Sequence, residues 1–171
     1  MQLLYIGMAL AIGAGASTQI AMLSAVGRQR GSLEAVWITV LGTIAATAVF
    51  LAVRAARGEA LLPPPFDRAT LYAAVAVVAA AALLLALREL DLYFAVMGLF
   101  GLGVILGAAF LGPRIGVALF IGAMIAGQLT TALLLDHIGA FGAEVERATL
   151  LRAGGVAALI LGVALVRGGG E

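Results

Sequence analysis

The sequence contains no cysteine and only one histidine, which narrows the chemistry open to it. Without cysteine, disulfide bonds and thiolate reactions are excluded. No cluster of metal-ligating residues accompanies the single histidine, His137, so neither a metal nor a cofactor is predicted. Lysine is also absent, since all ten basic residues are arginine, and these are scattered singly between apolar runs. Because they form no basic stripe, a nucleic-acid partner is not expected.

Charge as a whole is scarce. Charged residues make up 11% of the chain, whereas soluble domains average roughly 25%. Hydrophobic residues reach 64%, and the mean hydropathy is +1.17. These values indicate an integral membrane protein whose partners include the lipid bilayer. With 171 residues, little length remains for loops, which predicts one transmembrane domain over residues 1–171 and no soluble domain.

Six apolar stretches are long enough to cross a bilayer. Each approaches the ~20 helical residues that span a ~30 Å hydrocarbon layer. The first has no basic segment before it and exceeds a signal-peptide core, so it is predicted to be a retained helix. The predicted fold is a compact all-α bundle of six transmembrane helices, at residues 3–26, 33–53, 71–87, 92–112, 115–135 and 150–166.

The arginines give no preferred orientation. Six spans place five of them on each side of the membrane, so the cationic bias that normally sets topology is missing. A protein that inserts both ways and pairs as an antiparallel homodimer would show this balance. Chance would show it too, because an equal split is the most frequent random outcome. The two sets are Arg54, Arg57, Arg68, Arg114 and Arg167, against Arg28, Arg30, Arg88, Arg147 and Arg152.

The most unusual polar residue is Gln128, in the span at 115–135. Its amide would lie about 10 Å inside the hydrocarbon layer, where only protein or a bound molecule offers hydrogen bonds. Gln19 lies at a similar depth, since each glutamine precedes the end of its span by seven residues. Thr131 shares a helical face with Gln128. Either these groups hold helices together, or they line a path for a solute.

Four residues near the ends of the spans complete a predicted polar pocket. Glu34 suits the first turn of a helix, and alternatively lies at a cavity mouth as a cation or proton site. Trp37 is either an interfacial anchor or a substrate contact. Asp136 and His137 are candidates for coupling or gating, although a solvated helix end also explains them.

Small residues predict where helices pack closely. Gly15 belongs to a four-residue repeat of small side chains that ends in Gln19. Gly103 and Gly107 form a GxxxG pair, a spacing that lets two helix backbones approach. These three glycines are therefore predicted packing positions.

Several segments resemble one family. GQLTTALLLDHIGAFG at 127–142, PRIGVAL at 113–119, LLRAGGVAALILGVALVR at 150–167 and the first span with Gln19 are similar to the YdcZ-type branch of the drug/metabolite transporter superfamily. The resemblance covers about three quarters of the chain. It implies a multi-pass transporter of the bacterial inner (plasma) membrane, related to small multidrug resistance proteins, that acts as a dimer with an inverted-repeat relation.

The chain departs from that family at two points. Family members usually show five helices, so the stretch at 71–87 would be one helix beyond a five-helix core. Related small multidrug exporters exchange protons through a carboxylate in the first helix, where this chain has Gln19. An amide does not titrate, so proton coupling of that type would require Glu34, Asp136 or His137.

We therefore predict a transporter subunit that moves a small polar or amphipathic solute by alternating access. Gln19, Gln128 and Thr131 would line the cavity, and Glu34 would lie near its mouth. The alternative is a non-transporting scaffold or assembly subunit, in which the polar residues only join helices. An enzyme is not predicted, because no serine or cysteine nucleophile lies near a base.

Overall fold

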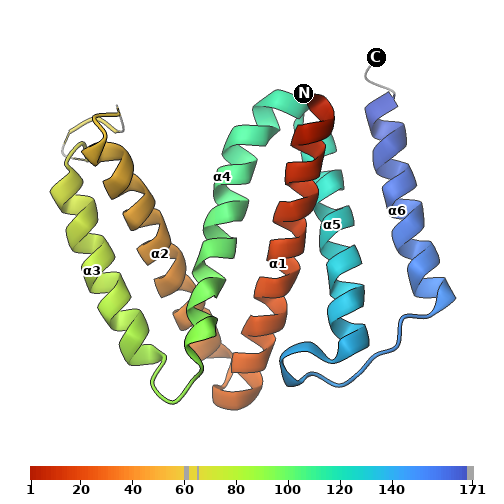
Figure 1. The fold of residues 1–171 in the computed structure, drawn as a ribbon, viewed down its shortest axis with the longest axis horizontal. Helices are drawn as coiled ribbons and strands as arrows, with labels where there is room; N and C mark the ends of the chain where they lie inside the picture. Colours follow the sequence, from red (N-terminus) through yellow and green to blue (C-terminus); the bar gives the residue numbers. More distant parts are fainter. Residues whose placement is uncertain (60–61, 65, 169–171) are drawn as a thin grey trace. The chain divides into compact units, whose positions relative to one another are not determined.

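The computed structural model describes residues 1–59, 62–64 and 66–168, which form helices joined by short connections, with no strand among them (Figure 1). The helices are α1 (Gln2–Arg30), α2 (Ser32–Ala56), α3 (Ala69–Ala86), the 3-10 helix η1 (Leu92–Val96), α4 (Met97–Ile115), α5 (Val117–Ile138), the 3-10 helix η2 (Ala140–Gly142) and α6 (Leu150–Gly168). Six segments are long and apolar enough to cross a membrane, with η1 and α4 forming the fourth. The predicted all-α class and the six spans are confirmed.

Two helix boundaries differ from the predicted spans for the same reason. α1 continues to Arg30, and a single residue, Gly31, separates it from α2. α4 likewise continues through Pro113 to Ile115, and Gly116 alone separates it from α5. Gly31 (φ 95°, ψ 157°) and Gly116 (φ 83°, ψ 148°) adopt a backbone conformation that is essentially restricted to glycine. A one-residue break therefore replaces the loop expected at each boundary.

Contacts within the chain divide it into two compact units. Unit 1 comprises Met1–Ala25 and Gly103–Glu171, and unit 2 comprises Val26–Leu102. α1 and α4 contribute residues to both units. Each unit has its own closely packed helix pair, and we describe the two units separately.

In unit 1 the backbones of α1 and α5 touch. A Cβ atom on Gly13 would lie 2.8 Å from the Gln128 nitrogen and closer still to the Met124 carbonyl oxygen. Gly127 similarly lies against the backbone of Leu10. The apolar core beside this contact consists of Ala9, Leu111, Phe120 and Ala123. α6 packs on α5 without burying any of its own described residues.

In unit 2, α2 packs along α3, and its contact with the start of α4 is glycine against glycine. A Cβ atom on Gly98 would lie 2.6 Å from the Cα atom of Gly42 and nearer still to that residue's carbonyl group. The buried face of α2 carries Ala35, Ile38, Leu41, Ala45 and Ala48. Both units therefore depend on close backbone approach more than on large interlocking side chains.

The three glycines predicted to pack helices behave differently from one another. Gly107 is buried and lies against the Ile12 side chain. At Gly103 a Cβ atom would meet nothing within 4 Å. Gly15 lies half-buried within α1.

Candidate functional site

The contact between α1 and α5 positions Gln128. Ser17, whose exposed fraction is 4%, donates a hydrogen bond from its hydroxyl to the backbone carbonyl of Gln128. The adjacent Gly127 faces α1, so the Gln128 side chain leaves α5 roughly 100° around the helix from the contact. That side chain is half-buried, and its amide forms no hydrogen bond with the part of the chain that the structure describes.

Gln19 lies on a different face of α1 from the α5 contact. Its position is about 200° around the helix from Ser17, because two residues separate 17 and 19. The side chain is half-buried and also lacks a hydrogen bond within the described residues. The structure therefore places both glutamines in unit 1 without joining them across the helix contact. The sequence analysis did not identify Ser17, because its role depends on the Gln128 carbonyl that faces it from α5.

Two neighbouring threonines on α5 differ in their hydrogen bonding. The Thr130 hydroxyl donates to the Ala126 carbonyl oxygen at 2.7 Å, the usual way in which a helix satisfies a hydroxyl in lipid. The Thr131 hydroxyl has no hydrogen bond among the described residues and is half-buried. Thr131 shares its helical face with Gln128, so these two groups form one polar patch on α5.

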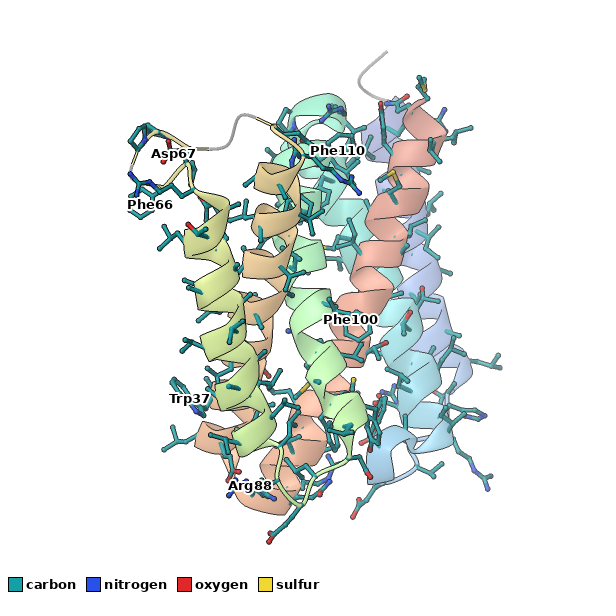
Figure 2. All side chains as sticks on the ribbon, turned by 60° about the vertical axis from the view of Figure 1, so that its left-hand side comes forward. Trp37, Phe66, Asp67, Arg88, Phe100 and Phe110 are labelled. Atoms are coloured by element: carbon teal, nitrogen blue, oxygen red, sulfur yellow. The ribbon has the colours of Figure 1, made fainter. Side chains whose placement is uncertain are left out.

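Glu34 and Trp37 belong to unit 2. The Glu34 carboxylate lies 2.7 Å from the Arg30 guanidinium. Arg30 also donates to the carbonyl of Ala86 at 3.5 Å and to the carbonyl of Arg88, beyond the C-terminal end of α3. Glu34 thus lies in a cluster that ties the α1–α2 corner to α3, where unpaired carbonyls favour a cation. Trp37 is 57% exposed and projects outward from α2 (Figure 2).

Asp136 and His137 lie in the last turn of α5, which extends to Ile138, past the predicted end at residue 135. The Asp136 carboxylate lies 2.7 Å from the Arg152 guanidinium on α6. Arg152 also lies 3.2 Å from the Glu146 carboxylate. Arg152 lies near the start of the predicted span at 150–166, but the sequence does not pair it with Asp136, because the path of the connecting loop is not a local property.

Backbone hydrogen bonds hold that loop against the end of α5. The Glu146 amide donates to the Asp136 carbonyl oxygen at 2.9 Å. The Ala148 amide donates to His137 Nδ1 at 3.2 Å, so that nitrogen acts as the acceptor. Asp136 and His137 therefore both fasten the α5–α6 connection.

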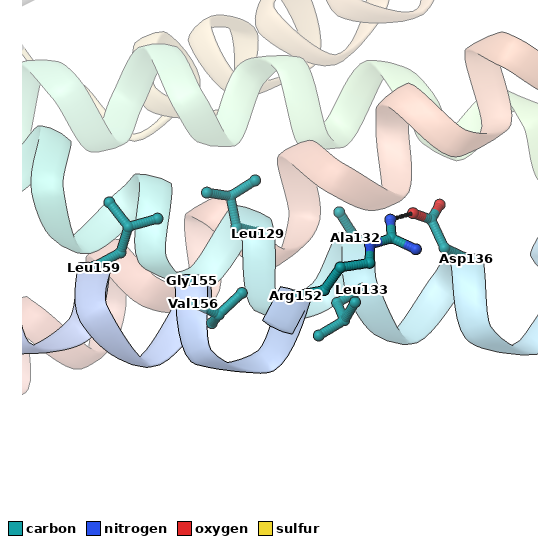
Figure 3. Close-up of a pocket in the computed structure, with 8 residues that line it drawn as sticks. All are labelled: Leu129, Ala132, Leu133, Asp136, Arg152, Gly155, Val156 and Leu159. Atoms are coloured by element: carbon teal, nitrogen blue, oxygen red, sulfur yellow. Dashed lines mark hydrogen bonds and ion pairs between the residues drawn. The ribbon is translucent and has the colours of Figure 1, made fainter. Parts of the chain in front are cut away.

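A groove of about 370 Å³ runs between α5 and α6 and ends at the Asp136–Arg152 pair (Figure 3). Its lining residues are Leu129, Ala132, Leu133, Asp136, Arg152, Gly155, Val156 and Leu159. A second groove of about 230 Å³ adjoins it at Leu159 and continues along the same helix pair. Of the predicted site residues, only Asp136 lines these two grooves. Among the described residues, no group of three or more histidine, aspartate and glutamate side chains could hold a metal ion.

Comparison with known proteins gives one match. The family described as "Putative inner membrane exporter, YdcZ" matches residues 65–165, which are 101 of the 171 residues. The match contains α3, the helix predicted to be additional to a five-helix core, and it leaves out α1 and α2. No curated protein and no solved structure matches the chain.

Proposed function

The chain belongs to the YdcZ family of inner membrane exporters, and from this premise we propose that it is a subunit of a transporter for small polar or amphipathic solutes. Membership in this family supports a multi-pass location in the inner membrane. It also supports a general transport function more than a catalytic one. The proposal adds that the subunit works by alternating access, as a homodimer in which residues 1–171 act as one transmembrane domain.

One observation carries the proposal. Gln19, Gln128 and Thr131 lie in membrane-spanning helices of unit 1, are half-buried, and have no side-chain hydrogen bond within the described chain. Moving such a group from water into hydrocarbon without a partner costs roughly 2–7 kcal/mol. Lipid cannot supply the partner, whereas a polar solute or the water that accompanies it can. We assign these three residues to the solute path.

The residues at the helix ends have supporting roles in this proposal. In unit 2, Arg30 holds the Glu34 carboxylate, and release of that ion pair would free a carboxylate one helical turn from Trp37, so these two residues are assigned as further solute contacts. Asp136 and His137 hold the loop that leads to α6, so movement of α6 would require their contacts to break. They are therefore assigned to gating or coupling.

Transport by reconstituted protein tests the proposed path. In a solute screen with proteoliposomes, Gln128→Leu is expected to reduce the flux of every transported solute about tenfold or more, the effect of losing one good hydrogen bond. Thr131→Val should also reduce flux. Thr130→Val is the matched control and should leave flux unchanged, because the Thr130 hydroxyl bonds to its own helix. Wild-type flux in Gln128→Leu would show that the amide does not line a solute path.

The homodimer is proposed to be antiparallel, which requires insertion in both orientations. The absence of cysteine makes this measurable, since an introduced thiol is the only one to react. Ser32 and Ala56 are exposed residues at opposite ends of α2, about 36 Å apart along the helix axis. If insertion is dual, an impermeant maleimide added to intact cells should label about half of each single-cysteine variant, Ser32→Cys and Ala56→Cys. Complete labelling of one variant and none of the other would establish a fixed topology.

A further inference from the structure

The groove between α5 and α6 combines an apolar wall with a charged end. Apart from Asp136 and Arg152, its lining is aliphatic or glycine (Figure 3). Gly155 leaves it open, because a Cβ atom there would meet nothing within 4 Å. The volume of about 370 Å³ falls within the roughly 300–1,000 Å³ range of small-molecule sites. An amphiphile with an apolar chain and a polar head fits this arrangement better than a wholly polar solute.

The depth of the groove in the membrane matches that of a phospholipid. α5 has 22 residues and α6 has 19, so the helices are about 33 and 28 Å long, close to the ~30 Å hydrocarbon layer. Asp136 lies near the end of α5 and Arg152 near the start of α6, which places both at the level of the headgroups. From Arg152 to Leu159 the groove descends about 10 Å toward the bilayer centre, the direction followed by an acyl chain of the same leaflet.

The charged end of the groove carries both positive and negative side chains. The Arg152 guanidinium lies between the carboxylates of Asp136 and Glu146, at 2.7 and 3.2 Å. All three side chains remain accessible, with exposed fractions of 38% for Arg152, 44% for Asp136 and 69% for Glu146. A zwitterionic headgroup complements this set, with its phosphate at the guanidinium and its ammonium at the carboxylates.

We propose that this groove binds one phospholipid with a primary-amine headgroup, with an acyl chain along α5 and α6 and the ethanolamine phosphate at Asp136, Arg152 and Glu146. A primary ammonium group donates up to three hydrogen bonds to carboxylates, whereas the quaternary ammonium of choline donates none. The site therefore distinguishes ethanolamine from choline headgroups. It is separate from the proposed solute path, because Gln19, Gln128 and Thr131 do not line it.

Lipid retention by the purified full chain tests the proposal. Delipidated protein is mixed with phosphatidylethanolamine, phosphatidylcholine or phosphatidylglycerol carrying identical acyl chains, and native mass spectrometry counts the bound lipid. Ethanolamine lipid should be retained roughly tenfold better than choline lipid, the effect of one charge-assisted hydrogen bond or more. Asp136→Asn should reduce this ratio several-fold while some lipid still binds, and the ratio within one sample does not depend on how much protein is folded.

Filling the groove provides a second, independent test. Gly155→Leu should remove bound ethanolamine lipid, because the new side chain occupies the open space in the groove. Gly154→Leu is the matched control, since this neighbouring residue is exposed, has equally open space and does not line the groove. Equal retention of ethanolamine and choline lipids would overturn the proposal, as would stronger binding of phosphatidylglycerol. Gly155→Leu protein that keeps its lipid but loses its dimer would identify a second copy of the chain as the occupant instead.

Discussion

Gly13→Ala is expected to lower the melting temperature of the purified protein by roughly 2–12 °C, since overpacking typically costs about 1–3 kcal/mol. The added Cβ atom would collide with the backbone of α5, at the Met124 carbonyl and the Gln128 nitrogen. Backbone atoms cannot rotate away as a side chain does, so the two helices must separate. Separation would also break the hydrogen bond from Ser17 to the Gln128 carbonyl.

The same helix provides the control for this prediction. At Gly7 a Cβ atom would meet nothing within 4 Å, so Gly7→Ala should be neutral or stabilising by the ~0.5–1 kcal/mol that alanine gains over glycine inside a helix. Gly127 lies on the α5 side of the same contact, so Gly127→Ala should lower the melting temperature by about as much as Gly13→Ala. The melting temperatures of all three variants can be measured by heating the protein and monitoring its unfolding with fluorescence-detected size-exclusion chromatography. Similar melting temperatures for Gly7→Ala and Gly13→Ala would show that α1 and α5 do not touch at this point.

Gly98→Ala should destabilise unit 2 by a comparable amount, because its Cβ atom would enter the space occupied by the carbonyl group of Gly42. The clash is again with backbone, and it would push the start of α4 away from α2. We expect a drop of several degrees in melting temperature, together with faster proteolysis of the loops in unit 2.

Gly103→Ala is the control for Gly98→Ala on α4. Gly103 has open space around its Cβ position, so the substitution should leave the melting temperature within a degree or two of the wild type. The comparison also separates two criteria for identifying packing glycines. If Gly103→Ala proved as harmful as Gly98→Ala, the GxxxG spacing would identify the packing surface better than the observed contacts do.

Part of the candidate site follows directly from sequence. Gln19, Gln128 and Thr131 stand out because amides and hydroxyls are conspicuous inside long apolar stretches, and the structure leaves their side chains without hydrogen bonds among the described residues. The helix faces that these residues occupy are decided only by the tertiary structure. Nothing in the spacing shows that Ser17, and not Gln19, faces α5. The groove at Arg152 could not be predicted from the sequence either, because Asp136 and Arg152 are 16 residues apart across an irregular loop.

The sequence by itself determined the class of the molecule and its six membrane-spanning segments, since hydropathy is a sum over neighbouring residues and needs no knowledge of which helices meet. Only the tertiary structure decided which of the described glycines bring helices together, Gly13 and Gly127 between α1 and α5 and Gly42 and Gly98 between α2 and α4. It also decided that Gly31 and Gly116 act as one-residue breaks. Both outcomes depend on helix faces and backbone angles, which chains of nearly uniform hydrophobicity do not encode in any local pattern.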